Sequence, residues 1–137
     1  MLRFQVFSDG KPAPHVELNG AYLVGSDGVP IRAELQFREG EIRCSKRAQG
    51  PAALVLLWPV QGYGQVMLQT ARVPERPTPY NLHLELARGR LAGVFAKCEE
   101  WGLFDYPGVE TIWGQIDRAR DLMIRALQAD EPAEAAQ

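Results

Sequence analysis

The chain has 137 residues, of which 46% are hydrophobic and 23% are charged. This length suits one domain with a compact core. The formal net charge of −2 gives no basic surface for nucleic acid or an anionic membrane. No apolar run approaches the roughly 20 residues that a membrane-spanning helix needs.

The amino-terminal segment is strand-like. Leu2, Phe4 and Val6 alternate with polar residues, so this segment lacks the continuous apolar run of a signal peptide. We therefore expect a cytoplasmic protein. Cys44 and Cys98 are far apart and have no partners at metal-ligand spacing, which predicts two reduced, packed thiols rather than a disulfide or a zinc site.

The first half of the chain predicts short antiparallel strands. Apolar and polar residues alternate over 31–38, and after Glu39-Gly40 the alternation continues to residue 46, which predicts a hairpin. Residues 53–58 are apolar on both faces, as in a central strand, and 65–71 alternate less cleanly. About six such strands predict an antiparallel β-sandwich or jelly-roll-like domain over 1–74.

A change of character follows at residues 74–79, which contain three prolines. Thr78 is a candidate helix cap with Pro79 at the first helical position, and the helix should run to about Glu100. Gly89 and Gly93 are small residues that would let another backbone come close. The apolar stripe of this helix consists of Leu84, Ala87, Leu91, Val94, Phe95 and Cys98.

A second helix is predicted from Val109 to Gln128, with Ile112, Ile116, Ala119, Met123 and Ala126 as its stripe. We expect residues 75–128 to form a helical hairpin that packs on the strands as one structural unit, giving an α+β fold. Residues 129–137 resemble the start of a truncated helix, which suggests the amino-terminal piece of a longer protein; the alternative is a frayed, solvated tail.

Motifs for catalysis are absent from the sequence. The Gly62-Tyr63-Gly64 triplet lacks the strand–helix context of a nucleotide site, and no serine stands in a nucleophile elbow. His15 and His83 are unrelated in spacing, and His83 is expected to be exposed or to cap a helix. Glu99 and Glu100 are adjacent, so they do not face each other across a glycosidic bond. We expect no catalytic residue, no metal site and no cofactor.

Aromatic residues give the clearest functional signal. In the segment 58–65, aromatic rings and glutamines alternate with glycines, and such residues stack on sugar rings and bind their hydroxyls. The alternative is that Trp58 ends a buried strand and Tyr63 covers the core edge. Trp101, Phe104 and Trp113 are expected to pack where the helices meet. The candidate carbohydrate-binding residues are Trp58, Gln61, Tyr63, Gln65, Tyr80 and Tyr106.

The stretch 78–91, with Glu85-Leu86-Ala87-Arg88-Gly89 at its centre, and the later Trp101 resemble planctomycete-type family-10 glycoside hydrolases, which are endo-1,4-β-xylanase-like. In that family a strand-rich region and helices precede a catalytic (β/α)₈ barrel, and the two catalytic glutamates belong to the barrel. No position here matches those glutamates. The resemblance implies a non-catalytic amino-terminal accessory module.

Two functions follow from these observations. The first is carbohydrate binding, with a polysaccharide as the partner. The second is an interaction or dimerisation scaffold, whose helices pack on a carboxy-terminal (β/α)₈ barrel or on a second copy of the chain.

Overall fold

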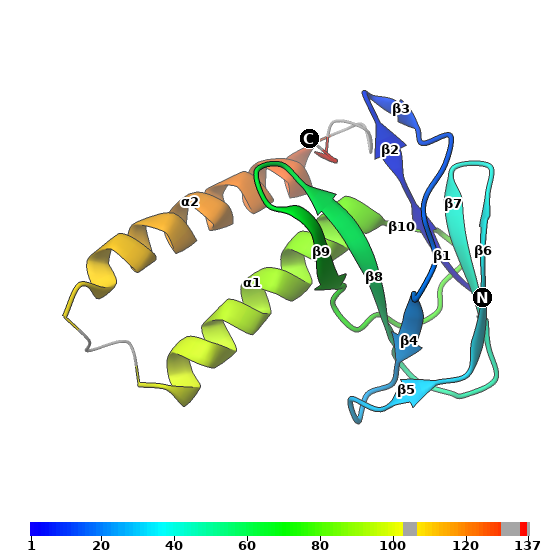
Figure 1. Cartoon of the computed structure of the whole chain (residues 1–137), viewed down its shortest axis with the longest axis horizontal. Helices are drawn as coiled ribbons and strands as arrows, with labels where there is room; N and C mark the ends of the chain where they lie inside the picture. Colours follow the sequence, from blue (N-terminus) through cyan, green and yellow to red (C-terminus); the bar gives the residue numbers. More distant parts are fainter. Residues whose placement is uncertain (103–106, 130–134, 137) are drawn as a thin grey trace.

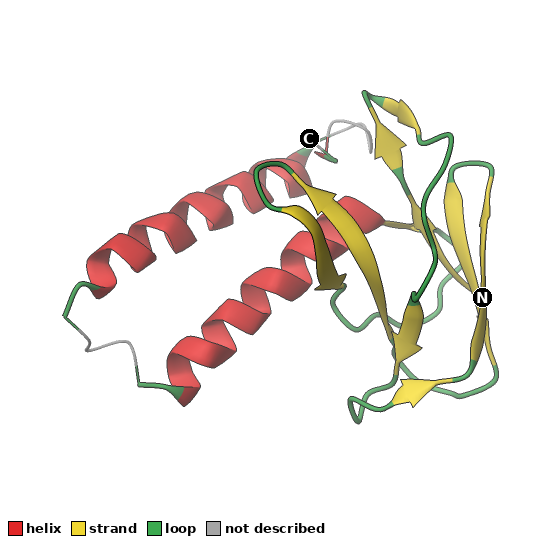
Figure 2. Cartoon of the chain, in the orientation of Figure 1, coloured by secondary structure: helices red, strands yellow, loops and turns green. Residues whose placement is uncertain are grey.

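The computed structural model describes residues 1–102, 107–129 and 135–136. The amino-terminal half of the chain forms a β-rich body. Two long helices project from one side of this body, where they lie side by side and antiparallel to each other (Figures 1 and 2). This arrangement confirms the predicted α+β fold, in which a β-rich region precedes two helices.

The first sheet has four strands in the order β10-β1-β7-β6. Strands β6 and β7 form the predicted hairpin, and Glu39 and Gly40 turn the chain with positive φ angles of 54° and 76°. Strand β1 is antiparallel to β7 and parallel to β10. The strands are β1 (Leu2–Gln5), β6 (Ala33–Arg38), β7 (Glu41–Lys46) and β10 (Tyr80–Asn81).

The second sheet has the order β5-β4-β8-β9, so the apolar strand β8 is central, as predicted. The prediction of one strand over 31–38 is wrong, because Ile31 pairs with Leu23 in this sheet and Ala33 pairs with Lys46 in the first. The chain crosses from one sheet to the other at this point. The strands are β4 (Tyr22–Val24), β5 (Pro30–Ile31), β8 (Ala53–Val60) and β9 (Gly64–Gln69), and a separate small hairpin contains β2 (Phe7–Ser8) and β3 (Lys11–Pro12).

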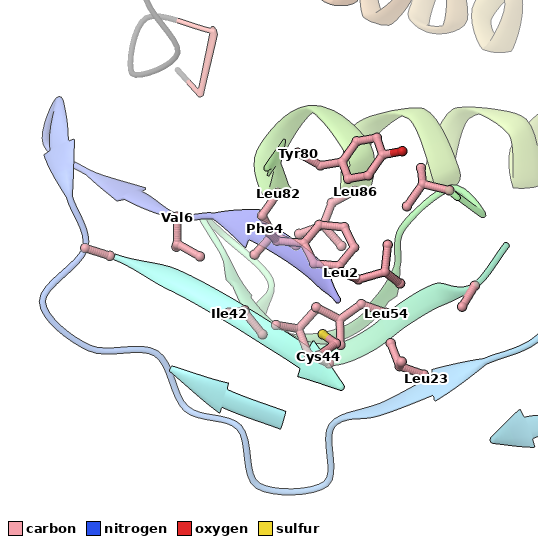
Figure 3. Packing of buried hydrophobic residues seen from close by; sticks show 14 residues of the cluster. Leu2, Phe4, Val6, Leu23, Ile42, Cys44, Leu54, Tyr80, Leu82 and Leu86 are labelled. Atoms are coloured by element: carbon pink, nitrogen blue, oxygen red, sulfur yellow. The ribbon is translucent and has the colours of Figure 1, made fainter. Parts of the chain in front are cut away.

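The core lies between the two sheets and is closed by the first helix (Figure 3). The alternation in β1 buries Leu2 and Phe4 completely, and β8 contributes Leu54 and Leu56. Burial of such side chains is the main favourable term in folding. The other members of the cluster are Val6, Ala13, Leu23, Ile42, Cys44, Ala52, Val73, Tyr80, Leu82 and Leu86.

Both cysteines are buried and unpaired, as predicted. Cys44 lies in the core, where burial raises the pKa of its thiol to about 12. Its thiolate is therefore disfavoured at neutral pH.

The first helix, α1, spans Leu82–Glu100, so the predicted start with Thr78 as the cap and Pro79 as the first helical residue is wrong. Tyr80 and Asn81 instead form β10, because the Tyr80 ring is buried against Phe4. Asn81 is the cap, and its side-chain oxygen accepts hydrogen bonds from the backbone N–H groups of His83 (3.1 Å) and Leu84 (3.4 Å).

Helix α1 has two apolar faces, of which the sequence predicted only one. Leu82 and Leu86 pack into the core between the sheets. The predicted stripe lies on another side, where its Phe95 contacts Trp113 of the second helix with ring centroids 6.0 Å apart. The sheet-facing side was missed because Glu85, which is buried there, breaks its apolar pattern.

Helix α2 spans Val109–Gln128, as predicted. Ile116 is buried and Met123 is half-buried, but Ile112 is exposed. The expectation that Trp101 packs where the helices meet is wrong, because 64% of its surface is exposed. Phe104 and most of the expected third helix, 130–134 and 137, lie outside the described residues. In the part of the chain that is described, neither helix has a stretch long and apolar enough to cross a membrane.

Candidate functional site

A groove of about 500 Å³ lies between the β8–β9 hairpin and the amino-terminal half of α1. Its size falls within the range of small-molecule sites. The hairpin contributes one wall and the helix contributes the other. The lining residues are Trp58, Val60, Tyr63, Val66, Leu68, His83, Leu86, Ala87, Arg90 and Ala136.

The groove exists because only the first part of β8 is covered by the core, and the strand continues beyond it. The first four residues of β8 are buried, but the burial alternates from Leu57 to Val60. Side chains two positions apart point to the same face of a strand, so Trp58 and Val60 continue the face of Leu54 and Leu56. Trp58 pairs directly with Val66 of β9. The core face of this hairpin therefore extends past the sandwich and becomes the wall of the groove.

His83 joins the groove to the amino-terminal strands. Its Nε2 accepts a hydrogen bond of 3.0 Å from the backbone N–H of Phe7. Its ring meets Trp58 edge-on, with centroids 5.3 Å apart and an interplanar angle of 83°. Burial lowers the pKa of His83, which favours the neutral ring at pH 7. Because Nε2 accepts, the neutral ring carries its proton on Nδ1. The predicted exposed or capping role of His83 is wrong.

Tyr63 lies at the tip of the hairpin and is 81% exposed. Its backbone N–H donates to the carbonyl of Val60 (2.9 Å), and Gly62 and Gly64 on either side have φ angles of +85° and +73°. These two glycines permit the tight turn, because residues with a Cβ rarely adopt such angles. Tyr63 thus presents a free aromatic ring at the mouth of the groove.

The structure brings together two of the six residues predicted for sugar binding, Trp58 and Tyr63. Gln61 and Gln65 are exposed at the same hairpin tip but do not line the groove. Tyr80 is buried in the core, where its hydroxyl donates to the carbonyl of Pro74 (2.6 Å), so its ring is not accessible to a ligand. Tyr106 lies outside the described residues.

Sequence reasoning missed the helical wall of the groove. His83, Leu86, Ala87 and Arg90 are spaced by three, one and three residues, which places them on one side of a helix. This spacing is a signal in the sequence. Periodicity alone does not say which strand such a face meets.

The groove is mostly apolar. Most of its lining residues are aliphatic, two aromatic rings come from the β8–β9 hairpin, and Arg90 is the one lining residue among those described that carries a fixed charge. The guanidinium of Arg90 has five N–H donors and no acceptor. No cluster of three or more His, Cys, Asp or Glu side chains that would hold a metal occurs within the described residues.

The structure is a β-sandwich with an attached helical hairpin and an apolar, aromatic-lined groove. Comparison with known protein families, with curated proteins and with solved structures finds no match for this chain.

Proposed function

We propose that this chain is a non-catalytic binding module whose groove takes a sugar residue of a polysaccharide. The observation that carries the proposal is that Trp58 and Tyr63 line one groove together with His83 and Arg90, two residues that have N–H donors. A pyranose ring has apolar C–H faces and a rim of hydroxyls. Aromatic rings suit the faces, and polar side chains suit the rim.

The groove residues divide these tasks. Tyr63 offers an open ring for stacking, because its side chain is largely exposed. Trp58 is half-buried and held edge-on by His83, so it forms part of a rigid wall. Arg90 and the Nδ1–H of His83 donate hydrogen bonds to hydroxyl oxygens. Each of the two interpretations of the hairpin is therefore used for one residue. Trp58 lies at the end of the buried part of a strand, and Tyr63 is the exposed ring.

The choice of a polysaccharide as the ligand is also supported by the resemblance of residues 78–91 to the family-10 glycoside hydrolases. Xylan fragments are therefore the first ligands to test. A matched set of glucan and mannan fragments determines whether the groove distinguishes between sugars.

The test is a titration of the isotopically labelled chain with these oligosaccharides, followed by NMR. We expect concentration-dependent shifts of resonances from β8, β9 and the start of α1. Tyr63→Ala should weaken binding about tenfold or more, which is about 1.4 kcal/mol or more. Tyr22→Ala is the matched control, because Tyr22 is also partly exposed but lies outside the groove, and it should bind like the unaltered chain.

Two outcomes would contradict the proposal. One is the absence of shifts with every glycan at millimolar concentration. The other is an equal loss of binding in Tyr63→Ala and Tyr22→Ala, which would place the contact outside the groove.

A further inference from the structure

Helix α2 carries a second stripe beside the one that faces α1. Its members recur at intervals of four, three, four and three residues, which is the spacing of a seam between two packed helices. The face toward α1 contains Ile116 and Met123, which are buried and half-buried. The second stripe consists of Trp113, Asp117, Arg120, Ile124 and Leu127.

Much of this second stripe is uncovered. Ile124 is 50% exposed and Leu127 is 53% exposed, and the side chains of Asp117 and Arg120 are more than half exposed. Trp113 is half-buried against Phe95 of α1, and the guanidinium carbon of Arg120 lies 5.8 Å from the centroid of the Phe95 ring. The helices extend beyond the β-rich body (Figure 1).

Four of the five residues of the stripe match one another when an antiparallel copy of the same helix is placed against it. An antiparallel copy of α2, with a two-fold axis between positions 118 and 119, places Trp113 opposite Ile124 and Asp117 opposite Arg120. Each helix already holds Asp117 and Arg120 together, with Oδ1 and Nη1 3.7 Å apart. The pair of helices then brings four charges of alternating sign to the axis, flanked by apolar contacts. A parallel copy would place Asp117 against Asp117 and Arg120 against Arg120, which repel.

We propose that the partner of this stripe is a second copy of the chain, which docks its α2 antiparallel across this two-fold axis. Such an interface is isologous, because the same surface is used on both copies. The charge order along the helix determines the register, and the two contacts of Trp113 with Ile124 contribute the apolar area. This inference is independent of what the groove binds.

Leu122 provides a matched control. It is exposed to a similar extent as Ile124 and Leu127, but it lies on the other flank of α2, where it lines a cavity with Leu84, Ala135 and Ala136. A charge introduced at Leu122 therefore does not enter the proposed interface.

The first experiment is sedimentation velocity of the whole chain over a range of concentrations. The unaltered chain should pass from monomer to dimer as concentration rises. Ile124→Glu should raise the dissociation constant about tenfold or more, and Leu122→Glu should leave it unchanged. Circular dichroism of each variant shows whether the helices are retained.

A charge exchange tests the register. Asp117→Arg should weaken the dimer, because two arginines then face each other across the axis. The double variant Asp117→Arg with Arg120→Asp restores opposite charges at both contacts and should regain the dimer. A chain that stays monomeric at millimolar concentration would overturn the proposal. A dimer that is insensitive to Ile124→Glu, or one that the double variant does not restore, would overturn it equally.

Discussion

Glu85 is the residue whose position has the clearest energetic consequence. Its carboxylate is buried on the side of α1 that faces the sheets, and one of its oxygens, Oε2, has no hydrogen-bond partner among the described residues. Arg88 is the nearest cation, with Nη1 3.8 Å from Oε1. Burial raises the pKa of Glu85, and Arg88 and Arg76 partly oppose that shift. The folded protein therefore binds this proton more tightly than the unfolded chain does.

The sign of the pH dependence follows from this difference. Above the raised pKa the buried charge lowers the free energy of unfolding, and this penalty is relieved as the pH falls through the folded pKa toward 4.5, the ordinary value. We expect Glu85→Gln to be more stable than the unaltered chain at pH 7.5, by about 1–2 kcal/mol. The difference in free energy of unfolding between the two proteins should be smaller at pH 5. Urea denaturation at both values measures it.

Comparison with Glu99→Gln controls for a general effect of charge, because Glu99 is exposed on the same helix. The free energy of unfolding of Glu99→Gln should differ little from that of the unaltered chain at either pH. If the difference in free energy of unfolding between Glu85→Gln and the unaltered chain is the same at pH 7.5 and pH 5, protonation of Glu85 is not linked to folding.

At the scale of the element, α1 is placed by small and polar residues as much as by apolar ones. A Cβ built on Gly89 would lie 2.7 Å from the carbonyl carbon of Thr70 and 2.8 Å from the backbone nitrogen of Ala71. The prediction that glycine allows close backbone approach is thus confirmed at Gly89. At Gly93 it is wrong, because nothing lies within 4 Å.

These two glycines give a matched pair of variants on one helix. Gly89→Ala should lower the free energy of unfolding by about 1–3 kcal/mol, because backbone atoms must move to admit the methyl group. Gly93→Ala should raise it by about 0.5–1 kcal/mol, since alanine favours the helix and meets open space. Chemical denaturation followed by tryptophan fluorescence measures both changes. Equal effects of the two substitutions would contradict the proposed packing of α1.

The same helix shows what the residues of the segment 85–89 do in the fold. In the segment 85–89, Glu85 is buried and paired with Arg88, Leu86 lies in the core, and Gly89 meets the strand. Ala87 lines the groove. Packing therefore accounts for four of these residues, and both Leu86 and Ala87 line the candidate site.

At the scale of the whole molecule, the amino-terminal half of α1 packs as part of the β-sandwich. The carboxy-terminal half of α1 and the start of α2 do not. Leu82 and Leu86 are core residues, and β10 pairs with β1 immediately before the helix. Beyond Gly89 the helices are held mainly by each other, through contacts such as Phe95 with Trp113. Segments with few buried contacts open at lower free energy than the core does.

Hydrogen exchange should show this gradient. We expect amides of β1, β7, β8 and residues 86–91 to exchange only through global unfolding, and amides of 94–100 and 112–116 to exchange about tenfold faster or more. The measurement is best made on Ile124→Glu, so that self-association does not add protection to α2. If the amides along both helices exchange at the same slow rate as those of the strands, the helical pair and the β-sandwich unfold as a single unit.

Local patterns were sufficient for most of the elements. The 31–46 hairpin is confirmed from Ala33 onward, and the bounds of α2 match the prediction. The start of α1 was misplaced, because a burial requirement at Tyr80 outweighs the helix-start signal of Thr78 and Pro79. Of the candidate site, the sequence supplied the aromatic hairpin residues Trp58 and Tyr63 but not the helical wall.

The sequence by itself determined the alternation that makes the strands, the periodicity that makes the helices and the glycines that expose Tyr63, because these depend on residues close together in the chain. Only the tertiary structure decided that Tyr80 is buried while Tyr63 is open, that His83 contacts Trp58, and that α1 packs through two faces. Each of these depends on contacts between residues far apart in the sequence, and periodicity does not specify which surfaces meet.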